Sequence, residues 1–163
     1  FNEYIAHIKS GLKLRQNYKD EIIVTGRFKR DDLLSLMGQC HCFVMPSYGE
    51  AWCIPALEAM ALKIPVIYTK GTGMSDFCSG IGVTSSEVPC YKAVDSLPNL
   101  YTANSKWNEI DVEQLAFAMR SMYTKYKEAP KDFEKDRAKA KRAAAKYSHK
   151  KVGNIIKRIL NDS

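Results

Sequence analysis

The sequence of 163 residues lacks any long apolar run. Its longest mostly apolar stretch, residues 51–62, is short and is interrupted by Glu58. A membrane-spanning helix needs about 20 consecutive apolar residues, so the sequence predicts none. A secretory signal is not visible either, although a cut start could have removed one. Phe1 stands where an initiator methionine would, and we expect a piece of a longer protein.

Cysteine is scarce, odd in number and unevenly spaced, with five residues at 40, 42, 53, 78 and 90. This pattern predicts reduced thiols and a cytoplasmic protein. Cys40-His41-Cys42 suggests a metal site, but it leads into the apolar strand expected at 43–45. Alternation along a strand would point the two cysteines to one face and His41 to the other. The sequence therefore predicts packed thiols and no metal.

Acidic residues are few in the last quarter of the chain. Residues 125–163 hold 13 Lys and Arg against 5 Asp and Glu, whereas residues 1–124 hold 12 against 13. The net charge of +7 therefore resides in the tail, which argues against a nucleic-acid-binding surface along the whole chain. A peripheral contact between residues 125–158 and an anionic membrane stays open as an alternative.

Short apolar runs alternate with helical patterns. Strands are expected at 21–26, 42–45, 65–69 and 81–83, and helices at 3–16, 31–37 and 55–62. Such alternation predicts an α/β fold, a Rossmann-like parallel sheet flanked by helices. Ligands bind beyond the C-terminal ends of strands in these sheets, and Gly26, Ser47 and Thr69 mark such ends. We expect the following side chains to be buried in the sheet: Val24, Phe43, Val44, Val66 and Ile67.

Local signals complete the outline. Asp31 or Asp32 can cap a short helix, and Leu57, Met60 and Ala61 are expected to face inward from the next one. Residues 84–110 show little periodicity and predict a functional loop. Asp111 with Gln114 predicts a capping box, followed by an apolar stripe of Val112, Leu115, Ala116, Met119, Met122 and Tyr123. A helix break is expected near Tyr147, before a last helix. We expect one domain over 1–163, with 111–163 as a helical C-terminal extension.

Residues 46–60 read PSYGEAWCIPALEAM, with Glu50 in a loop and Glu58 about one turn into the next helix. The start of that helix offers unpaired N–H groups and a positive dipole end, which suit a diphosphate. A carboxylate just beyond can accept two hydroxyl hydrogens from a vicinal diol. The spacing therefore suits a nucleoside diphosphate sugar. Taken alone, Glu50 is better explained as a solvated loop acid and Glu58 as a favourable charge in a first helical turn.

The whole string resembles the E-x7-E signature of family-4-like retaining GT-B glycosyltransferases. Val24-Thr25-Gly26-Arg27-Phe28 is similar to the strand and turn that frame the nucleotide base in that family. Residues 71–76, reading GTGMSD, resemble its glycine loop. The resemblance covers 22–76 strongly and implies the C-terminal half of a GT-B fold, N-terminally truncated and lacking the acceptor domain.

The resemblance implies a role for each matched position. Glu58 would bind the ribose hydroxyls and Glu50 would lie at the transferred sugar. Further donor contacts would come from Trp52, Cys53, Ile54, Gly26, Arg27, Ser47 and Gly73. The implied reaction is a retaining, metal-independent glycosyl transfer that needs no cofactor, with the protein's own N-terminal acceptor domain as partner. A non-catalytic nucleotide-binding relative or partner subunit is the alternative.

Three features depart from the family pattern. Ala51 and Cys53 stand where the family usually has glycine, so side chains limit backbone approach to the sugar. Lys63 replaces the usual glycine after the helix, and a left-handed backbone there would cost about 1 kcal/mol. The basic residues that neutralise the diphosphate in the family come from an earlier segment, which this chain lacks.

Overall fold

The computed structural model describes residues 22, 24, 26–90 and 104–161, and the helix expected at 3–16 lies outside them. The elements in chain order are α2 (Arg30–Gly38), β1 (Phe43–Met45), α3 (Ile54–Ala61), β2 (Val66–Thr69), η1 (Gly73–Asp76), β3 (Gly80–Val83), β4 (Ser85–Pro89), β5 (Lys106–Ile110), α4 (Val112–Glu128), α5 (Pro130–Ala144), η2 (Ala145–Tyr147) and α6 (His149–Asn161).

The three strands β1, β2 and β3 form one parallel sheet in that order. Val44 pairs with Ile67, and Ile67 pairs with Ile81. Successive side chains of a strand point to opposite faces, so Val66 and Ile67 enter different apolar clusters, one on each side of the sheet. Both are fully buried. The predicted α/β fold with a parallel, helix-flanked sheet is confirmed.

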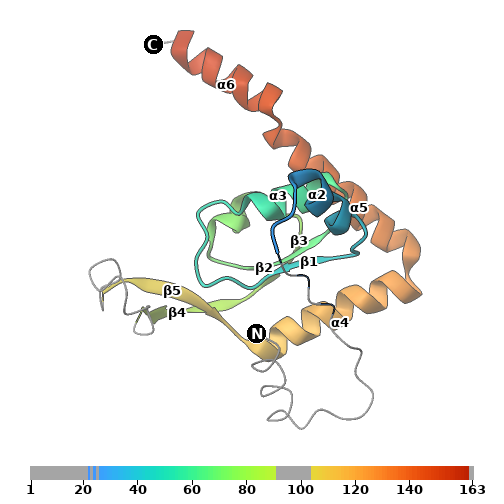
Figure 1. Cartoon of the computed structure of the whole chain (residues 1–163). Coiled ribbons are helices and arrows are strands. Elements are labelled where there is room, and N and C mark those ends of the chain that lie inside the picture. Colours follow the sequence, from blue (N-terminus) through green and yellow to red (C-terminus); the bar gives the residue numbers. More distant parts are fainter. Residues whose placement is uncertain (1–21, 23, 25, 91–103, 162–163) are drawn as a thin grey trace.

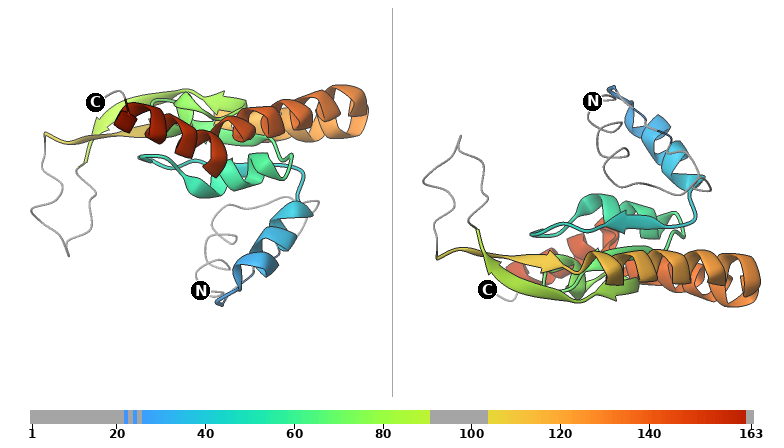
Figure 2. Two further views of the ribbon diagram at one scale, coloured as in Figure 1. Left: turned by 90° about the horizontal axis from the view of Figure 1, so that it is seen from above. Right: turned by 90° about the horizontal axis from the view of Figure 1, so that it is seen from below.

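Helices cover both faces of this sheet. On one face, α3, η1 and the end of α5 surround Val66 with Met60, Met74 and Phe77. On the other face, α4 and the start of α5 cover Ile67. Figure 1 shows α3 and α4 on opposite sides of the strands, with α5 running from one to the other, and Figure 2 shows the same layers from above and below. The strand ends that follow β1 and β2 therefore lie at one open edge.

Burial is less complete at β1 than the sequence predicts. Phe43 and Val44 are only half-buried, because β1 is the edge strand of the described sheet. Val24, also expected in a buried strand, is 48% exposed and belongs to no strand. An apolar run becomes a strand only by pairing with a neighbour, and β1 has no described partner besides β2.

Helices α2 and α3 differ slightly from the prediction, α2 in the residue that caps it and α3 in the residues that face the core. Lys29 occupies the N-cap of α2 without a side-chain bond, and the predicted caps Asp31 and Asp32 lie inside its first turn. Their charges still favour the positive helix end. In α3 the inward residue is Met60, together with Ala56 and Ala59, whereas Ala61 is exposed. A spacing of 3.6 residues per turn places Ala61 beyond the buried face.

Residues 84–110 contain a β-ribbon where a loop was predicted. Strands β4 and β5 pair antiparallel, with Val88 opposite Trp107 and Glu87 opposite Asn108. The alternation of polar and apolar residues in KWNEI is short, and the two strands carry many polar side chains. The sequence therefore shows no clear strand pattern here. The ribbon lies between β3 and α4 in the chain and beside the open edge of the sheet (Figure 1).

Asp111 caps α4 as predicted, but within the described residues the Gln114 side chain makes no bond back to Asp111, so the capping box is incomplete, and the buried face of the helix is rotated. The Asp111 side chain accepts hydrogen bonds from the N–H groups of Glu113 at 2.8 Å and Gln114 at 3.4 Å. Ala118 and Met122 are buried. Of the expected stripe, only Met122 is fully buried. Leu115 is half-buried, and four members are exposed: Val112, Ala116, Met119 and Tyr123. A second set at the same helical spacing, Leu115, Ala118, Met122 and Tyr126, faces the sheet instead.

The C-terminus of α3 closes with a lysine in a left-handed conformation. Lys63 has φ 64°, its N–H donates to Met60 at 3.0 Å, and the N–H of Ile64 donates to Ala59 at 2.9 Å. These two bonds form a Schellman motif, in which glycine is the preferred residue at this position. The departure from the family pattern therefore coincides with a strained backbone.

Replacing Lys63 with glycine is expected to raise the free energy of unfolding by up to about 1 kcal/mol, because the Cβ strain disappears. The greater freedom of glycine in the unfolded chain offsets part of this gain. Urea unfolding followed by circular dichroism measures the difference, with Lys139→Gly, at an exposed position inside α5, as the control that should destabilise. A destabilised Lys63→Gly protein would contradict the assignment of strain.

Candidate functional site

The loop that follows β1 and the glycine loop that follows β2 meet at the open edge. The N–H of Gly73 donates to the carbonyl oxygen of Glu50 at 2.9 Å. A Cβ at Gly73 would lie 1.9 Å from the carbonyl oxygen of Ala51. Only a residue without a side chain fits between these backbones. The glycine predicted from the motif thus holds the loop that carries Glu50.

A residue of the ribbon joins both loops. The backbone N–H of Asn108 donates to Tyr48 at 2.8 Å, and its side-chain Nδ2 donates to the carbonyl oxygen of Gly71 at 3.3 Å. The neighbouring Trp107 ring stacks on Tyr48 with centroids 4.8 Å apart. Sequence reasoning missed this contribution because residues 84–110 were expected to be a loop. The ribbon therefore supports the loop that ends at Glu50.

Helix α3 starts with open backbone donors. Cys53 is its N-cap, in a left-handed conformation with φ 61° and ψ 74°, and provides no side-chain bond. The N–H groups of Trp52 and Cys53 donate to no acceptor within the described residues. Ala56, by contrast, donates to the carbonyl oxygen of Cys53 at 3.1 Å. Free N–H groups at the positive end of a helix can donate hydrogen bonds to an anion, which is what the motif predicts for this position.

Glu58 lies on the outer side of α3 and forms an ion pair with Arg30 of α2. The Glu58 side chain is 16% exposed, whereas that of Arg30 is 70% exposed. Both border a cavity of about 840 Å³ between α3, the end of α5 and the start of α6. Trp52 and Ile54 line the same cavity. Three of the predicted donor residues are therefore brought together, and Arg30 joins them from a position that the motif does not include.

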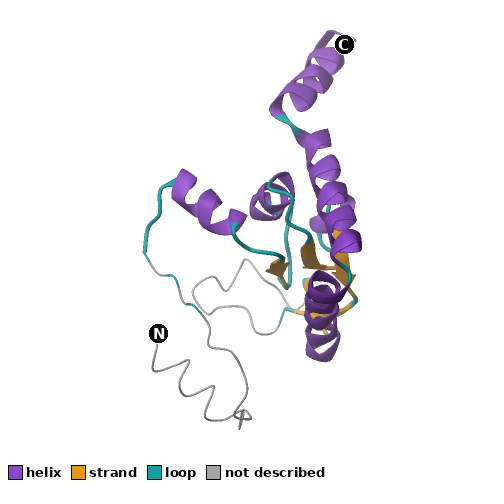
Figure 3. Ribbon diagram, turned by 90° about the vertical axis from the view of Figure 1, so that its right-hand side faces the viewer, coloured by secondary structure: helices purple, strands orange, loops and turns teal. Residues whose placement is uncertain are grey.

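An aromatic cluster fixes one wall of this cavity. Trp52 stacks on Phe77 with centroids 4.5 Å apart and meets the edge of Tyr147 at 5.1 Å. Tyr147 comes from η2, where α5 passes into α6, and Figure 3 shows α6 continuing past that point away from the sheet. The cluster links the predicted donor loop to the C-terminal helices.

The other predicted site residues lie outside this cavity. Gly26 and Arg27 are exposed and Glu50 is half-buried, and none of the three is among the lining residues. The Ser47 hydroxyl is buried, without a hydrogen-bond partner among the described residues, rather than open to a ligand. The structure thus groups Glu58 with Trp52 and Ile54, and separately ties Glu50 to Gly73.

All five cysteines are free thiols. Burial raises the pKa of the Cys78 thiol to about 12, and the adjacent Cys53 adds to the rise. Burial also raises the pKa of Cys53, and the nearby Glu50 carboxylate acts in the same direction. Both groups therefore stay neutral near pH 7, which leaves the loop that carries Glu50 without an extra negative charge.

The Cys40-His41-Cys42 sequence does not follow the predicted alternation. The strand begins only at Phe43, so positions 40–42 lie before it. Cys40 is exposed rather than packed, while Cys42 is half-buried and burial raises its pKa to about 11. The His41 ring lies against Tyr126 with centroids 4.1 Å apart. Within the described part of the chain, no group of three potential ligands gathers around a metal position.

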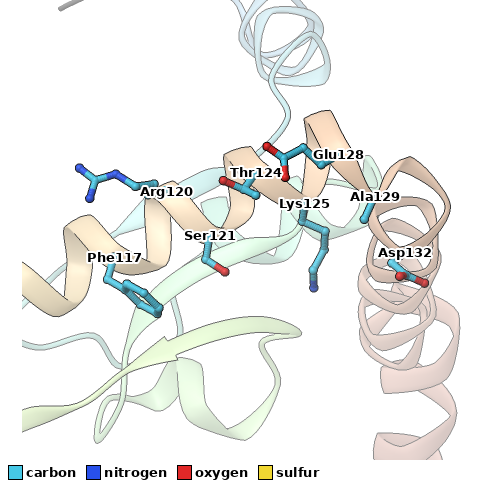
Figure 4. A pocket seen from close by; sticks show the side chains of 8 residues that line it. All are labelled: Phe117, Arg120, Ser121, Thr124, Lys125, Glu128, Ala129 and Asp132. Atoms are coloured by element: carbon cyan, nitrogen blue, oxygen red, sulfur yellow. The ribbon is translucent and has the colours of Figure 1, made fainter.

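A separate hollow of about 480 Å³ runs along α4 to the start of α5. Figure 4 shows its lining side chains, including Arg120, Lys125 and Asp132, along α4 and at the start of α5, where the two helices form a corner. None of the predicted site residues contributes to it. It therefore adds nothing to the site built around the loop after β1.

The segment that contains both loops and both glutamates lies within a match to a known protein family. Residues 10–79 match the family Glycosyl transferases group 1. The match ends just before β3 and so leaves the ribbon and the C-terminal helices outside it. No curated protein matches the chain. Among the described residues, no helix has both the length and the apolar character to cross a bilayer. The group 1 match supports glycosyl transfer as the reaction class.

Proposed function

We propose that the chain is the donor-binding part of a retaining, family-4-like GT-B glycosyltransferase that uses a nucleoside diphosphate sugar. The observation that carries this proposal is the group 1 match over 10–79, which includes Glu50, Glu58 and the glycine loop. The free donors at the start of α3 and the cavity beside Glu58 support it. The protein's own N-terminal acceptor domain would complete the enzyme.

The proposed donor lies across the start of α3. Its diphosphate accepts hydrogen bonds from the N–H groups of Trp52 and Cys53, where the helix dipole stabilises negative charge. Glu58 accepts hydrogen bonds from the two ribose hydroxyls. Arg30, which pairs with Glu58, adds a positive charge beside the nucleotide.

Glu50 contacts the transferred sugar in this proposal. Its loop is held by Gly73 and by Asn108, so its position does not depend on the donor alone. As charge builds on the departing diphosphate, the fixed donors of α3 stabilise it without a metal ion. The departing diphosphate oxygen guides the acceptor to the same face of the sugar from which the diphosphate leaves. The configuration at the anomeric carbon is therefore retained.

The full-length protein provides the test. Uridine, guanosine and adenosine diphosphate sugars are screened by thermal shift, and any stabilising donor is then assayed for hydrolysis and transfer with EDTA present. We expect one base to stabilise the protein and the product to keep the anomeric configuration by NMR. Stabilisation without turnover would favour the non-catalytic nucleotide-binding alternative. An inverted product, or activity lost with EDTA, would contradict the proposed mechanism.

The five free thiols support a reducing compartment, and we propose a cytoplasmic location on that basis. The proposal does not extend to nucleic acid. In the first half of α5, basic residues pair with acids, as in Lys135–Asp132 and Arg137–Glu134. They therefore do not form the uninterrupted positive surface that a phosphate backbone needs.

A further inference from the structure

The ribbon lies outside the family match, which ends at residue 79, yet it contacts both loops of the candidate site. Asn108, in the middle of β5, is half-buried at the open edge of the sheet (Figure 1). Its backbone N–H donates to the carbonyl oxygen of Tyr48 at 2.8 Å. Its side-chain Nδ2 donates to the carbonyl oxygen of Gly71 at 3.3 Å. One residue of the ribbon therefore holds the loop after β1 and the loop after β2.

The amide of Asn108 fits closely into its place. The Ser85 hydroxyl, which donates to the carbonyl oxygen of Lys70 at 2.7 Å, lies 3.3 Å from Asn108 Oδ1. A Cβ at Gly71, whose φ is 85°, would lie 2.5 Å from the same oxygen. The side chain thus stands directly against the Gly71 backbone. Its nitrogen is needed as a donor, so a residue of the same shape without the N–H group cannot replace it.

Two routes of backbone contacts lead from Asn108 to Glu50. The first passes through the carbonyl oxygen of Tyr48, two positions before Glu50. The second passes through Gly71 to Gly73, whose N–H donates to the carbonyl oxygen of Glu50 at 2.9 Å. Both routes reach the main chain of Glu50 and not its carboxylate. They therefore fix the point from which that side chain extends.

We infer that Asn108 is a positioning residue for turnover, because it sets the place of the Glu50 carboxylate relative to the transferred sugar. This role rests on the proposed function, in which Glu50 contacts that sugar. A misplacement of about 1 Å near the reacting atoms can lower a rate about 100-fold. Glu58, by contrast, pairs with Arg30 of α2 and would still bind the ribose. Loss of the Asn108 amide should therefore lower turnover and spare donor affinity.

Asn108→Ala and Asn108→Asp in the full-length protein test this role. Alanine removes the amide and keeps the backbone bond to Tyr48, whereas aspartate keeps the size and places an oxygen against the Gly71 carbonyl. The probes are uridine, guanosine and adenosine diphosphate glucose. We expect both variants to lower turnover at least about tenfold, measured well below their melting temperatures, with donor affinity by isothermal titration within about twofold of wild type. A purely structural residue would lower the melting temperature without this split.

The matched control is Asn104→Ala, at an exposed asparagine that precedes β5, and its turnover should equal that of wild type. If Asn108→Ala has the turnover of this control, or if donor affinity falls as much as turnover, Asn108 does not position Glu50 for the reaction.

A measurement without donor separates this inference from the proposed function. Hydrogen exchange followed by mass spectrometry reports on the Gly73 amide, which donates to Glu50. Asn108→Ala should speed its exchange, and Asn104→Ala should not. Faster exchange together with a wild-type protein that transfers none of the three sugars would overturn the proposed function and keep Asn108 as the residue that places Glu50. Unchanged exchange would overturn the inference in an active enzyme as well as in an inactive one.

Discussion

Replacing Gly73 with alanine is expected to lower the free energy of unfolding by about 3 kcal/mol and to reduce turnover of the full-length protein sharply. The new Cβ would lie 1.9 Å from the carbonyl oxygen of Ala51. This neighbour is backbone, so relief requires the whole loop to shift, at the upper end of the usual cost of overpacking. The shift also breaks the bond from Gly73 to Glu50. Urea unfolding and steady-state kinetics measure the two effects.

The control for this change lies in the neighbouring loop, the one that follows β1. A Cβ at Gly49 meets no atom within 4 Å, so Gly49→Ala should alter stability by less than about 1 kcal/mol. Comparison of the two variants separates the loss of a particular contact from a general intolerance of alanine. If Gly73→Ala were as stable and as active as Gly49→Ala, the two loops would not be packed as described.

Glu58→Gln in the full-length protein is expected to weaken donor binding by about 1–3 kcal/mol, because a carboxylate that accepts two hydroxyl hydrogens becomes a mixed donor and acceptor. Loss of its charge also releases Arg30. Glu50→Gln, by contrast, should lower turnover more than it lowers donor affinity, because Glu50 is proposed to touch the reacting sugar. Isothermal titration and kinetics on both proteins separate affinity from turnover.

Glu134→Gln is the matched control for this pair, since Glu134 is a glutamate that pairs with Arg137 on the surface of α5. Its donor affinity and turnover should equal those of wild type. Wild-type affinity in Glu58→Gln would remove Glu58 from the ribose site. Wild-type turnover in Glu50→Gln would remove Glu50 from the reaction, even with the fold unchanged.

The parallel sheet could be predicted because its strands carry short-range signals. Pro46 stops β1, Pro65 precedes β2, and Val66 and Ile67 are both apolar, as burial on two faces requires. The motif that joins the loop after β1 to α3 could also be predicted, because the spacing of the two glutamates places Glu50 before α3 and Glu58 within it. These features depend on residues close together in the chain.

Features that depend on distant residues were missed. The ribbon arises from pairing between β4 and β5, whose residues are some twenty positions apart, and nothing local marks Asn108 as the link between two loops. The face of α4 was misassigned because two apolar stripes coexist on it, and only contact with Ile67 and Val83 selects one. The pairing of Arg30 with Glu58 likewise joins two helices that sequence reasoning treats separately.

The bonds of Asn108 tie together segments that are far apart along the chain. Tyr48 precedes α3, Gly71 follows β2, and Ser85 of β4 lies 3.3 Å from the Asn108 side-chain oxygen. A fluctuation that opens the ribbon must therefore also release the backbone just before Glu50, at Tyr48, and just before Gly73, at Gly71. Local unfolding of this edge is then a single cooperative event rather than three independent ones. The candidate site therefore stays folded or unfolds locally as one unit.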